Sequence, residues 1–142
     1  MKGLATLIRL HKLKLTEQQR RLAALDAVAR GFRNEIGALD RTAREEAGLA
    51  AGNPDTAYLL GAFVQASIAR RRTLEGSLAG VEREMAGIRE QVAAAFREVK
   101  RYELIADRRR TEARQAQQRR ERRIENEVGL TMHRQKKAAS GA

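Results

Sequence analysis

The chain has 142 residues and a formal net charge of +11, with no Cys, no Trp, two Tyr and three Phe. The absence of cysteine excludes disulfides, thiolate metal sites and cysteine nucleophiles. So few aromatic residues in a composition rich in Ala, Leu, Glu, Gln and Arg indicate long helices rather than a thick globular core.

The first predicted element is a helix over about residues 3–50. Its apolar side chains recur at alternating steps of three and four, the spacing of a coiled-coil seam. This first stripe consists of Leu4, Ile8, His11, Leu15, Gln18, Leu22, Leu25, Ala29, Phe32, Ile36, Leu39 and Ala43. One side of this helix is therefore expected to pack along a partner helix.

The segment after this helix, GLAAGNPDT at residues 48–56, contains the only proline of the chain and two glycines. Asn53 is predicted as an N-cap, with Pro54 at the first helical position and Asp55 in the positive first turn. Gly52 or Gly48 can supply the left-handed residue that ends the preceding helix. We therefore predict a turn at about residues 51–53.

The second predicted helix covers about residues 54–135, and the tail 136–142 is expected to be frayed. Its stripe consists of Leu60, Val64, Ser67, Arg71, Leu74, Leu78, Val81, Met85, Ile88, Val92, Ala95, Val99 and Tyr102. A short turn folds consecutive helices back on each other. The predicted fold class is all-α: a two-helix antiparallel coiled-coil hairpin, with residues 1–142 as a single helical hairpin domain and an overhanging C-terminal helix.

Two registers fit the two stripes. In the first, Leu25 faces Leu78 and the stripes pair without a stutter, but Phe32 meets the aliphatic stem of Arg71. A shift of one heptad pairs Phe32 with Leu78 and Leu25 with Met85, and needs a longer loop. We predict the first register.

The second helix is longer than the first, so residues after about Tyr102 have no partner within the chain. Residues 106–142 carry eleven Lys and Arg against five Asp and Glu, a net charge of +6. Arginine forks suit carboxylates on an acidic protein surface, which favours protein docking. Nucleic-acid binding is less favoured because Glu interrupts the basic run and no aromatic residues interleave. A membrane-surface helix would need a larger apolar face, and a merely solvated overhang is the other alternative.

The residues that could carry chemistry are few and scattered. His11 lies on the first stripe and His133 in the basic tail, and no Gly-rich phosphate loop, metal-spaced cluster or nucleophile elbow occurs. We therefore expect no catalytic residue, no metal site and no cofactor, and predict that the protein is not an enzyme.

Four segments together resemble a known family: KGLATLIRL at residues 2–10, YLLGAFVQ at 58–65, AAFREVKRYELI at 94–105 and RRERRIENE at 119–127. In length, order and spacing the chain is similar to the flagellar export protein FliJ family, particularly its alphaproteobacterial members. It departs from the family pattern at residues 129–133, where GLTMH replaces an acidic Asp-Glu pair.

The resemblance implies a component of the flagellar type III protein export apparatus, with a coiled coil like the stalk of rotary ATPases. Implied partners are the hexameric export ATPase ring, the cytoplasmic part of the export gate, and substrate chaperones. The ring contact would be made by arginines reaching several faces of the overhanging helix: Arg108, Arg109, Arg110, Arg119, Arg120, Arg122 and Arg123. The gate contact would be Phe63, because members of the family place an aromatic residue in this stretch and Phe63 lies beside the seam.

The expected location is the cytoplasm, peripheral at the inner face of the cell membrane. The N-terminal residues lack the continuous apolar core of a signal peptide, and no stretch is long enough to span a bilayer. Peripheral attachment to the membrane-embedded export apparatus is implied by the resemblance. Two alternatives remain: the stalk protein of a virulence type III secretion system, and a basic coiled-coil protein that binds nucleic acid.

Overall fold

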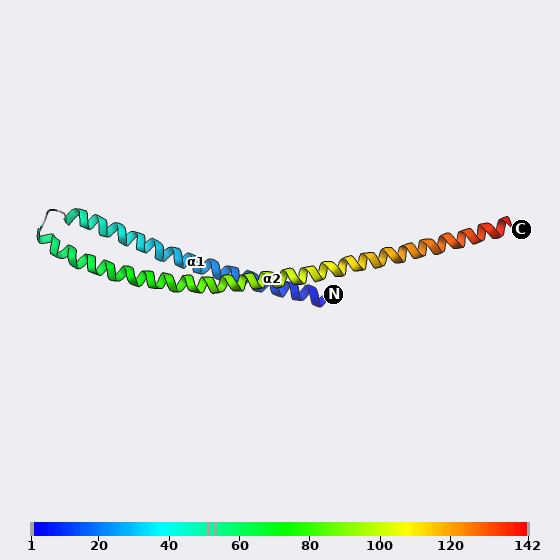
Figure 1. The fold of residues 1–142 in the computed structure, drawn as a ribbon, viewed down its shortest axis with the longest axis horizontal. Coiled ribbons are helices and arrows are strands. Elements are labelled where there is room, and N and C mark those ends of the chain that lie inside the picture. The colour runs from blue at the N-terminus through cyan, green and yellow to red at the C-terminus, as the bar shows by residue number, and fades with distance from the viewer. Residues whose placement is uncertain (1, 51, 53, 142) are drawn as a thin grey trace. The chain divides into compact units, whose positions relative to one another are not determined.

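A computed structural model describes residues 2–50, 52 and 54–141, and two long helices account for nearly all of them (Figure 1). Helix α1 spans Lys2–Ala50 and helix α2 spans Pro54–Ser140, with no strand in the described part of the chain. The predicted all-α class and helical hairpin are confirmed. The predicted helix starts and the end of the first helix agree with these bounds to within one residue.

The chain divides into two compact units. In the hairpin unit, His11–Arg97, the corresponding parts of α1 and α2 run antiparallel. The terminal unit combines Met1–Leu10 with Glu98–Ala142, and there Leu4 and Ile8 share an open cavity of about 280 Å³ with Ala106. That residues 1–142 act as a single domain stays a prediction.

The turn between the helices uses a glycine where the backbone requires one. Gly52 has φ 100°, a left-handed conformation that side-chain-bearing residues rarely adopt. Of the two glycines considered for this role, Gly52 therefore has it, and Gly48 lies inside α1. Pro54 begins α2 and Asp55 lies in its first turn, as predicted. The predicted N-cap, Asn53, is outside the described residues.

The core is a thin seam along the two stripes. Every member of the first stripe is buried or half-buried, and Arg71 is the one exposed member of the second. The most completely buried apolar residues are Ala29, Leu74, Met85, Ile88 and Val99. Each fully buried Leu, Ile or Met contributes about 1.5–3 kcal/mol, so stability accumulates layer by layer along the seam.

The register of the hairpin differs from the one predicted. Arg33 forms an ion pair with Glu82 at 2.9 Å. In the predicted register Arg33 would face Arg70, and Glu82 would lie twelve positions further along α2, about 18 Å at 1.5 Å per residue. Two side chains cannot bridge that axial offset. After the one-heptad shift Arg33 faces Ser77, and Glu82 is about 8 Å along the axis, which an Arg–Glu pair spans.

Two further observations agree with the shifted register. Asp40 pairs with Arg71 at 2.8 Å, although the predicted register would place Asp40 opposite Phe63. In the terminal unit Leu4 lies beside Ala106, whereas the predicted register would place it opposite Val99. Leu25 therefore faces Met85, and the predicted pairing of Leu25 with Leu78 is wrong. The stripes repeat every seven residues, so apolar spacing alone could not distinguish the two arrangements.

The end of α2 also differs from the prediction. The segment expected to fray, residues 136–142, is helical to Ser140, and the Gly141 amide donates a hydrogen bond to the Lys137 carbonyl at 3.0 Å. Gln, Lys and Ala between residues 135 and 139 are strong helix formers. The helix therefore stops only where Gly141 follows it.

Candidate interaction surfaces

The first candidate surface is the C-terminal part of α2, where all seven predicted arginines are located. From Asp107 to Gly141 every residue is exposed except Ala116, which is half-buried. Arg110 pairs with Asp107 on the same helix. The other six arginines form no ion pair or hydrogen bond with any residue that the structure describes. Their charged groups are therefore available to a partner.

Six of the seven arginines share one side of the helix. At 100° per residue they fall within an arc of about 160°, which we call the basic face: Arg108, Arg109, Arg119, Arg120, Arg122 and Arg123. Glu112 and Glu127 lie within the same arc. Arg110 lies outside this arc, so the seven predicted arginines are not confined to one side of the helix.

The opposite side of this helix has a different character. Arg110 and Arg114 lie there, close to the angular positions of Glu121 and Glu125. The exposed apolar residues Ile124, Val128 and Met132 follow the same side at steps of four. Positive charge is thus balanced on this side and concentrated on the basic face.

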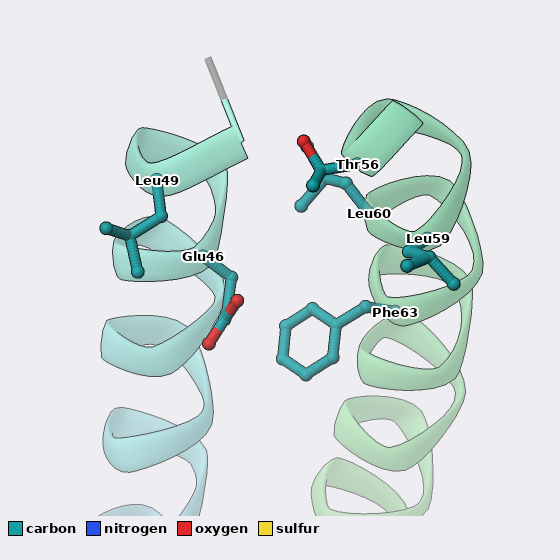
Figure 2. Close-up of a pocket in the computed structure, with 6 residues that line it drawn as sticks. All are labelled: Glu46, Leu49, Thr56, Leu59, Leu60 and Phe63. Carbon is teal, nitrogen blue, oxygen red and sulfur yellow. The ribbon is translucent and has the colours of Figure 1, made fainter. Parts of the chain in front are cut away.

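The second candidate surface is the tip of the hairpin, where six residues line an open cavity of about 360 Å³, referred to as the tip cavity (Figure 2). They are Glu46 and Leu49 from α1 and Thr56, Leu59, Leu60 and Phe63 from α2. The Phe63 ring and the Glu46 carboxylate point into the space between the two helices. Phe63 is half-buried and lies closer to the helix interface than its position beside the seam indicated.

Sequence analysis missed the apolar neighbours of Phe63 at the tip. Leu49 is 80% exposed, Leu59 is 66% exposed and Tyr58 is 84% exposed. Their signal was present in the sequence, because large apolar residues off the stripe flank the Gly52 turn on both sides. Together they make the tip an exposed apolar site of the kind often used in protein contacts.

Charged residues line the flanks of the hairpin seam. The ion pairs that connect α1 with α2 include Arg21–Glu84 at 3.6 Å, Arg33–Glu82 at 2.9 Å, Glu35–Arg70 at 3.4 Å and Asp40–Arg71 at 2.8 Å. Arg71 also donates to Glu75 at 2.9 Å. That hydrogen bond, together with the charge of Asp40, raises the pKa of Arg71 above its ordinary value. Both carboxylates thus hold the Arg71 guanidinium at the flank of the seam, although Arg71 occupies a position of the apolar stripe.

The histidines do not come together, since His11 is half-buried in the hairpin unit and His133 is exposed in the terminal unit. Among the described residues, no group of three His, Asp or Glu side chains could hold a metal ion. No helix within this part of the chain is long and apolar enough to cross a membrane. The expectations that the protein is not an enzyme and has no cofactor stay predictions.

Comparison with known proteins gives relatives of one kind. The curated proteins that match include the flagellar FliJ proteins of two strains of Caulobacter vibrioides, each 28% identical over 106 residues. The match covers 75% of this chain and 76% of each relative. No family model and no solved structure matches the chain. The alignment over three quarters of both proteins, together with the helical hairpin that the resemblance implied, makes this chain similar to the flagellar FliJ proteins.

Proposed function

We propose that this chain is a component of the flagellar type III protein export apparatus, where it acts as a coiled-coil stalk or adaptor. The proposal is supported by the flagellar name of its relatives and by the hairpin fold. Its role is the binding of other proteins, and it includes no chemical step. The protein would work in the cytoplasm, peripheral to the membrane-embedded part of the apparatus.

The observation that carries the proposal is the exposed C-terminal part of α2 with its unpaired arginines. Guanidinium groups form two parallel hydrogen bonds with a carboxylate, so a row of them fits an acidic protein surface. The proposed partner is the hexameric export ATPase ring, which this segment would enter. A one-sided basic face would contact the side of the ring nearest to it at any one time.

The tip of the hairpin is proposed as the contact with the cytoplasmic part of the export gate. Phe63 lines the tip cavity next to exposed Leu59, and an aromatic ring in an apolar setting is a common anchor of protein interfaces. Substrate chaperones are proposed as further partners, and no residue is assigned to them. These roles rest on the family resemblance together with the exposure of the two surfaces.

Truncation tests the ATPase role. A chain that ends at Ala106 lacks all seven arginines but keeps the whole hairpin unit, so it should remain helical and lose stimulation of the export ATPase. Circular dichroism measures the first property and phosphate release the second. The matched control ends at Arg134 and keeps all seven arginines, so it should stimulate as the full chain does. Full stimulation by the shorter chain would contradict the stalk role.

A further inference from the structure

The hairpin seam can accommodate two registers. In the observed one Leu25 faces Met85 and Leu22 faces Ile88. If α2 moved by one heptad, about 10 Å along α1, Leu25 would face Leu78 and Leu22 would face Val81. All four pairings place large aliphatic or thioether side chains together, and layers of this kind are interchangeable in a coiled coil. These two layers therefore do not select the register, whereas the layer of Phe32 favours the observed one, because Phe32 faces Leu78 there and would face Arg71 after the shift.

Two of the ion pairs between the helices do not select the register either. Arg21 pairs with Glu84 in the structure, and after the shift it would face Glu82, two positions away. Glu35 pairs with Arg70, and after the shift it would face Ile68, again two positions from its partner. Long charged side chains can bridge an offset of two positions, so these two pairs, which form in the observed register, can also form after the shift.

The other two ion pairs exist only in the observed register. Arg33 bonds Glu82 at 2.9 Å, and the shift would place Arg33 opposite Arg70, at the start of the run of three arginines 70–72. Asp40 bonds Arg71 at 2.8 Å, and the shift would place it opposite Phe63. Arg33 would therefore be repelled by arginines instead of attracted by Glu82. The Asp40 carboxylate would face an aromatic ring instead of a guanidinium.

The shift would also alter the tip of the hairpin. Phe63 now lines the tip cavity with Glu46 and Leu49. Moved by one heptad, Phe63 would lie beside Asp40, two turns of α1 away from Leu49. The tip cavity is therefore a property of the observed register alone.

We propose that the hairpin has two registers one heptad apart, that Arg33 and Asp40 select the observed one, and that the exchange between them assembles or dismantles the tip cavity. Charges beside a seam are known to set register in coiled coils, where the apolar repeat itself cannot. The inference rests on the hairpin unit and is independent of the proposed function.

Disulfide formation between paired cysteines tests this, because the chain has no cysteine of its own. One reporter carries Leu25→Cys with Met85→Cys, and the other carries Leu25→Cys with Leu78→Cys. Each reporter is made in the parent chain and with Arg33→Glu, which repels Glu82 and would attract Arg70 after the shift. A third background adds Glu82→Arg to Arg33→Glu. The matched control is Arg30→Glu, the same charge change at a residue whose ionic partner among the described residues is Asp26 on its own helix.

In the parent and in Arg30→Glu, the 25–85 disulfide should form and the 25–78 disulfide should not. Arg33→Glu should shift the ratio of the two by about tenfold toward 25–78, and adding Glu82→Arg should reverse that shift. An unchanged ratio in Arg33→Glu would overturn the proposal. Loss of both disulfides together with loss of helical content would overturn it too, since it would show that no second register is stable.

Discussion

Gly52 fixes the turn through its backbone rather than through its surroundings. Its φ of 100° is unfavourable for a residue with a side chain, yet a Cβ built there would meet no atom within 4 Å. Gly52→Ala should therefore destabilise the chain by about 1–2 kcal/mol through backbone strain alone. Gly48→Ala, inside α1 and equally open, should stabilise it by about 0.5–1 kcal/mol because alanine favours the helix. Chemical denaturation measures both, and equal effects of the same sign would contradict the assignment.

Phe63 is the residue through which the tip can be tested. If its ring anchors the export gate, Phe63→Ala should weaken binding of the gate's cytoplasmic domain by about 1–2 kcal/mol with no change in helical content. Phe96→Ala is the matched control, because Phe96 is another phenylalanine on α2 of the hairpin unit, 50% exposed and away from the tip cavity. Titration calorimetry measures the affinity. Equal binding by the Phe63→Ala variant and the parent would remove Phe63 from the gate contact.

Burial of individual residues followed the sequence pattern closely, and the exceptions are informative. The steps of three and four predicted the seam because only that spacing keeps one stripe of a helix against a partner. Arg71 is exposed at a stripe position because Asp40 and Glu75 hold its guanidinium at the flank of the seam. The placement of the Arg71 side chain depends on Asp40 of the opposing helix, so the apolar spacing of its own helix could not predict it.

The two helices were predictable as elements, whereas their register was not. The only proline and a glycine with positive φ lie between them, so the turn had local signals. Register depends on which layers of two repeating stripes meet, and a shift of seven residues leaves the apolar pattern nearly unchanged. The decisive contacts are Arg33–Glu82 and Asp40–Arg71, on the flanks of the seam.

The C-terminal part of α2 shows a second limit of sequence pattern. Its positive charge was evident from composition, but composition does not say on which side of a helix the charges lie. Once α2 is known to continue to Ser140, six arginines fall on the basic face, and Arg110 and Arg114 fall on the other side. The surface offered to a partner is therefore directional.

Net charge and charge placement make different predictions for binding. The chain carries +11 overall, and residues 106–142 contribute +6 of it. A strongly positive protein is drawn to any acidic partner by its summed field, which salt screens over about 8–10 Å. If this long-range attraction alone determined binding, equal changes in net charge would change the affinity equally on every side of the helix.

Two variants with the same net charge separate these cases. Arg119→Glu with Arg123→Glu reverses two charges of the basic face, and Arg110→Glu with Arg114→Glu reverses two on the opposite side of the same helix. If the basic face contacts the export ATPase, the first variant should need a concentration about tenfold higher or more for half-maximal stimulation. The reason is that each lost arginine–carboxylate contact costs about 1 kcal/mol or more. The second variant should lose only the smaller share of the apparent affinity that long-range attraction provides. In 0.5 M salt the difference between this variant and the parent should disappear. Equal losses in both variants would mean that the partner senses net charge, and that the basic face is not a docking surface.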